Sequence, residues 1–190
     1  MRSRATSLTL AAALLPAAAS AVPTPTADFS ASLPGTTVAA QPELAGIVIE
    51  DRMVPFSVPA SWGLVASGRV QVRTVRGPDG RLTFTWRIFS DRSSTVPIQS
   101  LEILGFPRMP YDANWRRDVI GTIAPSRVSG EALSGWRMKF VFLSPNAIAP
   151  GAESRFFFLR SSATASRPAG IRIWTGHASS PVLLAAGPAS

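Results

Sequence analysis

A hairpin pattern in residues 68–91 constrains the fold of this chain more than any other stretch. It reads GRVQVRTVRGPDGRLTFTWRIFSD, two runs of alternating apolar and polar residues around a turn at 77–80. The apolar positions of the second run are Leu82, Phe84, Trp86 and Ile88. A period of two is typical of antiparallel strands with one face in a core and the other in water. We therefore expect the arginine-bearing face of the hairpin to be solvated.

Short strand patterns recur along the chain, and no stretch of ten or more residues shows the 3.6-residue period of a helix. Further strands are expected at residues 44–50, 52–58, 98–106, 136–143, 155–162, 171–175 and 181–186. Pro55 restricts its strand to a sheet edge or a bulge. Residues 155–162, which are apolar on both faces at their centre, indicate an interior strand. The sequence predicts an all-β fold, an antiparallel β-sandwich (Ig-like or jelly-roll-like) of about eight or nine strands.

Composition divides the chain into three parts. Residues 1–21 have a basic start, an apolar run of about twelve residues and a small-residue cleavage site, which indicates a Sec-type signal peptide. That run is shorter than the roughly twenty residues of a membrane-spanning helix. Residues 22–42 are rich in Pro, Thr and Ala, and we expect a disordered linker. Residues 43–190 are expected to form a single β-sandwich domain, secreted or periplasmic in a bacterium and without a transmembrane segment.

Charge and composition exclude several chemistries. The chain has no cysteine, so thiol catalysis and cysteine-ligated metals are excluded. Its 19 basic residues against 11 acidic ones are dispersed singly, which favours a solvated surface over a nucleic-acid site. His177 is the single histidine, and there is no Gly-x-Ser-x-Gly sequence. We therefore expect no metal, no cofactor and no serine-hydrolase triad.

The region 108–133 shows no sustained period and is expected to be an irregular loop, where binding residues often lie. Candidate ligand-binding residues in predicted loops are Trp62, Tyr111, Asp112, Trp115 and Arg116. Exposed aromatic rings beside an arginine would form a platform for a glycan. The alternative is that these aromatic residues fold back and cover the ends of the core. Asp112 and Asp118 leave open a carboxylate-based hydrolase, which needs two facing carboxylates.

Four motifs carry a resemblance to known proteins: ELAGIVIEDRMVPFSV, the hairpin stretch above, YDANWRRD and RFFFLRSSATA. Their succession, over most of residues 43–165, resembles a group of secreted bacterial proteins of unknown function, many of which end in a PEP-CTERM-type sorting tail. The tail's Pro-Glu-Pro motif, apolar helix and closing arginine cluster do not occur here. The resemblance implies no catalytic residue.

These observations lead to an expected function. We expect an exported, non-enzymatic β-sandwich protein with a structural or interaction role in the bacterial envelope or extracellular matrix. A glycan-binding module that uses the loop aromatic residues is the alternative, and a carboxylate-based hydrolase is the second alternative. The expected partner is a glycan or another envelope component.

Overall fold

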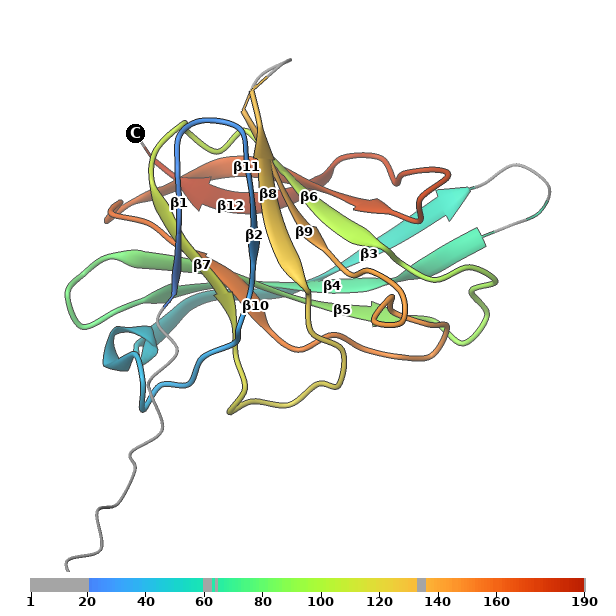
Figure 1. Ribbon diagram of the computed structural model, residues 1–190, viewed down its shortest axis with the longest axis horizontal. Helices are drawn as coiled ribbons and strands as arrows, with labels where there is room; N and C mark the ends of the chain where they lie inside the picture. The colour runs from blue at the N-terminus through green and yellow to red at the C-terminus, as the bar shows by residue number, and fades with distance from the viewer. Residues whose placement is uncertain (1–20, 60–62, 64, 133–135, 190) are drawn as a thin grey trace, which may run out of the picture.

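Two antiparallel six-stranded sheets pack face to face in the computed structural model (Figure 1). The structure describes residues 21–59, 63, 65–132 and 136–189, so the expected signal peptide lies outside it except for Ala21. This part of the chain contains a short 3₁₀ turn, η1 (Pro42–Leu44), and no α-helix. No helix among the described residues has the length and apolar character needed to cross a bilayer. The predicted antiparallel β-sandwich is confirmed, with twelve strands rather than eight or nine.

Each sheet combines strands from distant parts of the chain. Sheet A has the order β1 (Val22–Thr24), β7 (Tyr111–Trp115), β10 (Phe157–Arg160), β5 (Leu82–Ser90), β4 (Val65–Arg76) and β3 (Ile47–Pro59). Sheet B has the order β12 (Leu183–Pro188), β11 (Ser166–Trp174), β6 (Ser100–Leu104), β9 (Arg137–Val141), β8 (Arg127–Glu131) and β2 (Phe29–Ser32). The expected interior strand within residues 155–162 is β10, which lies between β7 and β5.

The predicted hairpin is the pair β4–β5, and its apolar positions face the core. In the register, Arg76 pairs with Leu82 across the turn. Trp86 is fully buried between the sheets, with its ring centroid 6.0 Å from that of Phe157 in sheet A and 6.1 Å from that of Phe140 in sheet B. The rings of Phe140 and Phe157 lie closer still, at 4.7 Å. Aromatic contacts therefore join the two sheets at the centre of the core.

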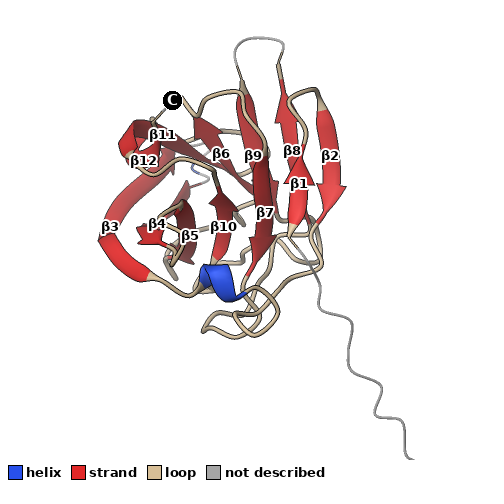
Figure 2. Cartoon of the chain, turned by 90° about the vertical axis from the view of Figure 1, so that its left-hand side faces the viewer, coloured by secondary structure: helices blue, strands red, loops and turns tan. Residues whose placement is uncertain are grey.

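The other face of β5 is not solvated, which corrects the expectation from the alternation. Thr83, Thr85 and Arg87 are all buried, and Arg87 forms an ion pair with Glu153 at 2.5 Å. The reason is a second layer of chain. The segment around η1 and neighbouring loops run below sheet A (Figure 2). In addition, the Arg87 guanidinium lies 5.6 Å from the centroid of the Phe156 ring. The outer face of sheet A is therefore largely covered at its centre.

Residues 22–42 do not form the expected linker. β1 pairs with β7 in sheet A, and β2 pairs with β8 in sheet B. Phe29 packs against Trp136 with ring centroids 6.2 Å apart, and Leu33 is buried in the core. The prediction of a linker from composition was wrong because an edge strand needs only backbone hydrogen bonds and a few apolar side chains.

The expected strands at 44–50 and 52–58 are one long strand, β3, at the edge of sheet A. The register with β4 shifts between Val48 and Glu50, where the strand has a bulge or irregularity. Pro55 lies in this edge strand, as its missing N–H group requires. The prediction of an edge position for Pro55 is confirmed.

Candidate functional site

The predicted loop at residues 108–133 contains two strands, β7 and β8, so the expectation of an irregular segment was wrong. β7 lies between β1 and β10 and carries three of the five candidate binding residues, and the fourth, Arg116, follows it directly. The fifth, Trp62, lies outside the described residues. The sequence did not predict β7 because the strand has only five residues. Its apolar positions hold one small residue and two isolated aromatic residues, which is too short a pattern to indicate a strand.

Tyr111 is a core residue and not part of a ligand platform. Its side chain is buried, and its ring centroid lies 5.8 Å from that of Phe106. The hydroxyl donates a hydrogen bond to the carbonyl of Pro107 at 2.8 Å. Burial raises the pKa of this hydroxyl well above its ordinary value, although the nearby charge of Arg167 acts in the opposite direction. The tyrosine therefore supports the alternative that the aromatic residues of this region cover the core.

Trp115 holds the chain segment that precedes η1. Its indole Nε1 donates a hydrogen bond to the carbonyl of Leu33 at 3.1 Å. The backbone of Gly35 lies so close to the ring that a Cβ at this position would come within 2.4 Å of Cζ2. The guanidinium groups of Arg117 and Arg155 each lie 5.6 Å from the ring centroid. With the backbone of Gly35 packed against its ring, this indole is not a free stacking surface.

The two candidate carboxylates beside these residues are both held by arginines. Asp112 lies 3.8 Å from Arg160, and Asp118 accepts hydrogen bonds from Arg116 at 2.7 Å and from the amide of Val38 at 2.8 Å. Burial alone would raise the pKa of Asp118, but the hydrogen bonds from Arg116 and Val38 outweigh it and lower the pKa below its ordinary value. Arg116 is therefore the counterion of Asp118.

Replacing Asp118 by asparagine tests this role. We expect Asp118→Asn to lower the free energy of unfolding by about 1 kcal/mol at pH 7, because a partly exposed charged hydrogen-bond acceptor is lost. Since the folded-state pKa is lowered, the contribution is fully present above the ordinary carboxyl pKa of about 4 and is lost as pH falls through the folded-state value. Urea denaturation at several pH values measures it. A difference between wild type and variant that grows as the pH falls would contradict the assignment.

A small hollow of about 260 Å³ lies beside β7. Asp112 lines it together with Arg81 and Arg160. Asp79 contacts both arginines, at 3.6 Å from Arg81 and in a very short contact with Arg160. The positive charges of the hollow are therefore neutralised by carboxylates already present.

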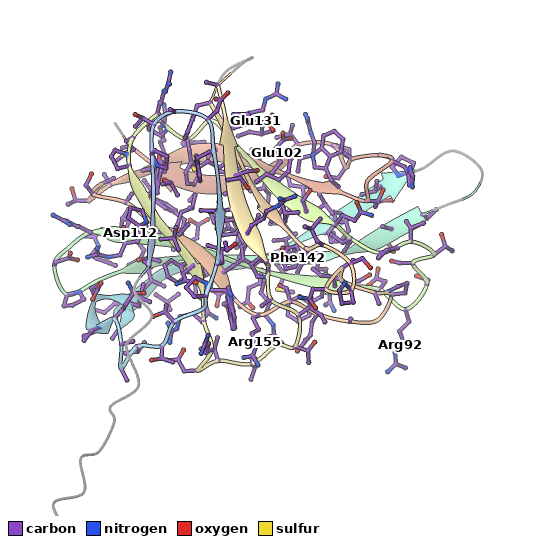
Figure 3. The ribbon with its side chains drawn as sticks, viewed as in Figure 1. Arg92, Glu102, Asp112, Glu131, Phe142 and Arg155 are labelled. Atoms are coloured by element: carbon purple, nitrogen blue, oxygen red, sulfur yellow. The ribbon has the colours of Figure 1, made fainter. Side chains whose placement is uncertain are left out.

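A different cluster lies on the outer face of sheet B. Because Leu101 and Ile103 point into the core, Glu102 between them points outward. The register pairs Glu102 with Arg172 on β11 and with Lys139 on β9. We use the name sheet B platform for the outward-facing residues around this row, which are Glu102, Arg137, Lys139, Arg172 and Trp174. Figure 3 shows Glu102 well separated from Asp112.

Glu102 is the centre of the sheet B platform. Its side chain is only 4% exposed. Its Oε2 atom accepts hydrogen bonds from Trp174 Nε1 at 3.2 Å and from Arg172 at 3.5 Å, and its Oε1 atom lies 3.8 Å from Arg137. Long neighbouring side chains thus cover the carboxylate and are oriented by it.

The cations of the sheet B platform outnumber its carboxylates. Arg137, Lys139 and Arg172 stand against Glu102 within the platform and Glu131 beside it, which pairs with Arg137 in the register, and each of the three cations is partly exposed. The Lys139 ammonium lies 5.2 Å from the centroid of the Trp174 ring, a cation–π contact. The sheet B platform is therefore a partly exposed surface with excess positive charge and an indole at one end.

Sequence reasoning missed this cluster for an identifiable reason. Strand alternation alone places Arg137 and Lys139 on one strand face, and Arg172 and Trp174 on another. It does not show that β9, β6 and β11 are neighbours, because that depends on pairing between distant segments. The one signal available was Glu102, a lone charge inside an otherwise apolar strand.

Neither a metal site nor a similar known protein gives further information about the function of this site. Among residues 21–59, 63, 65–132 and 136–189, no three His, Cys, Asp or Glu residues are grouped so that they could hold a metal ion. His177 lies exposed in a turn after β11. Comparison with known proteins identifies no significant match, whether to a protein-family model, to a curated protein or to a solved structure.

Proposed function

We propose that this protein is an exported, non-enzymatic module that binds an anionic glycan through the sheet B platform. The observation that carries the proposal is the row Arg172–Glu102–Lys139 with Trp174 beside it. Arginine and lysine bind sugar carboxylates or sulfates through charge-assisted hydrogen bonds, and an indole offers apolar surface to a sugar ring. The expected signal peptide at residues 1–21 supports an exported role.

The carboxylates favour binding over hydrolysis. A general acid in a glycosidase needs a raised pKa. The pKa of Asp118 is lowered instead, and Asp112 lies beside the guanidinium of Arg160. These ion pairs support a structural role for both groups and a non-enzymatic function for the protein.

The proposal is tested by titrating the protein with an oligogalacturonate in a calorimeter, with a neutral cello-oligosaccharide of equal length as comparison. We expect binding of the anionic sugar alone, weakening as salt is added. The double variant Lys139→Ala with Arg172→Ala should bind at least about tenfold more weakly, because two charged contacts are lost. Arg92→Ala is the matched control, since Arg92 is exposed and lies far from Glu102 (Figure 3).

Two results would contradict this function. One is the absence of binding to the anionic oligosaccharide at low salt. The other is an equal loss of affinity in the Arg92→Ala control and in the platform double variant, which would indicate attraction by overall charge. A parallel titration with duplex DNA distinguishes a sugar site from a general affinity for polyanions, which would bind both equally.

A further inference from the structure

The sandwich has two open sides, each formed by one edge strand from each sheet, and the two sides differ in how the chain connects the sheets. On one side the consecutive strands β1 and β2 lie in different sheets, so the chain itself passes from sheet A to sheet B there. On the other side lie the edge strands β3 and β12 (Figure 2). A hydrogen bond from Arg52 to the carbonyl of Leu184, at 3.1 Å, crosses that gap. A hollow of about 310 Å³ lies there, lined in part by Glu50, Arg52 and Leu184.

Exposed apolar side chains gather on this open side. Nine large apolar residues are exposed in the described chain, and six of them belong to β3 or to the run into β12: Ile47, Val48, Ile49, Met53, Val182 and Leu184. Ile47 is 74% exposed and Leu184 is 68% exposed. Apolar surface concentrated in one place, next to unpaired strand edges, is typical of a protein–protein interface.

β3 is far longer than the other edge strands and is self-complementary around Asp51. It has 13 residues, against 6 in β12, 4 in β2 and 3 in β1. When two copies of β3 are aligned antiparallel about Asp51, Glu50 of each copy faces Arg52 of the other, so the 2.8 Å ion pair that these two residues form within one copy would extend across the strand pair. In the same alignment Ile49, which lies at the register irregularity between Val48 and Glu50, comes opposite Met53. Opposite charges and apolar residues placed directly across a strand pair both stabilise it.

We propose that a second copy of this chain docks on β3, so that the two sheets A continue across a two-fold axis at Asp51. The charges at residues 50–52 and Pro55 disfavour pairing in other registers and with unrelated strands. The two Asp51 side chains do not meet as free charges, because Arg73 and Gln71 of the same copy bind each Asp51 carboxylate, at 2.6 Å and 2.8 Å. The dimer uses none of the platform residues, so it does not depend on the glycan proposal.

Charge exchange in β3 tests the register. Wild-type protein should show a concentration-dependent monomer–dimer equilibrium in sedimentation velocity experiments. Glu50→Arg alone and Arg52→Glu alone should each weaken the dimer at least about tenfold, because like charges then face each other. An equimolar mixture of the two variants should form a heterodimer, since every cross-strand pair is again complementary. This rescue also shows that both variants are folded.

A second pair of variants tests the apolar contact. Ile49→Lys should abolish the dimer, whereas Ile120→Lys, which changes an exposed isoleucine outside β3, should leave it intact. The proposal is overturned if the wild type stays monomeric at all concentrations, if the single charge variants dimerise as the wild type does, or if their mixture fails to associate.

Discussion

Replacing Phe157 by alanine is expected to lower the free energy of unfolding by about 3–5 kcal/mol, the largest stability loss that we predict for this chain. The Phe157 ring is fully buried and lies within 6.0 Å, between ring centroids, of Trp86, Phe140 and Phe142. It therefore contacts both sheets, and its removal leaves a cavity that rigid neighbours cannot fill. Urea denaturation followed by tryptophan fluorescence measures the loss.

Phe89→Ala is the matched control for Phe157→Ala. Phe89 belongs to the same sheet but is only partly buried, on the outer face, with the Arg87 guanidinium 4.5 Å from its ring centroid. We expect a loss of about 1 kcal/mol, typical of a substitution outside the core. Equal losses in the two variants would contradict a core that is centred on the aromatic cluster.

The second large effect is expected at Glu102. Glu102→Ala should cost about 2–3 kcal/mol, because it leaves Trp174 Nε1 without its acceptor and two cations, Arg137 and Arg172, without their carboxylate. The cost stays below that of a fully buried ion pair because Arg137 and Arg172 are partly exposed, with side-chain accessibilities of 41% and 28%. Glu102→Gln, which keeps an acceptor oxygen, should recover part of the loss.

Glu131 provides the comparison for Glu102. It is a carboxylate on the same outer face, one strand beyond Arg137, and it is exposed. Glu131→Ala should change the free energy of unfolding by less than about 0.5 kcal/mol. Thermal and urea denaturation of the three variants measure the differences. Similar behaviour of Glu102→Ala and Glu131→Ala would show that Glu102 does not organise the sheet B platform.

Local alternation was enough to predict the main strands. The hairpin β4–β5, the interior position of β10 and the edge position of Pro55 all follow from side-chain periodicity or from a missing backbone donor. Each of these features is determined by a few adjacent residues, so it can be predicted without knowing which distant segments pair with them.

Features that depend on distant partners were not predicted. The burial of Thr83 and Arg87 depends on chain from other regions that covers sheet A. Glu102, Lys139 and Arg172 meet only because β6 lies between β9 and β11. The sequence of β7 was compatible with two interpretations, a ligand-binding platform and a cap of aromatic residues on the core. The hydrogen bonds of Tyr111 and Trp115 to the backbone favour the cap.

The most direct test of the binding proposal is an NMR titration of the ¹⁵N-labelled protein with an oligogalacturonate. We predict that amide shifts cluster on β6, β9 and β11, around Glu102, Lys139 and Arg172, and that the indole signal of Trp174 moves with them. Shifts confined to β7 between Tyr111 and Trp115, or no shifts at saturating sugar, would contradict the proposed role of the sheet B platform.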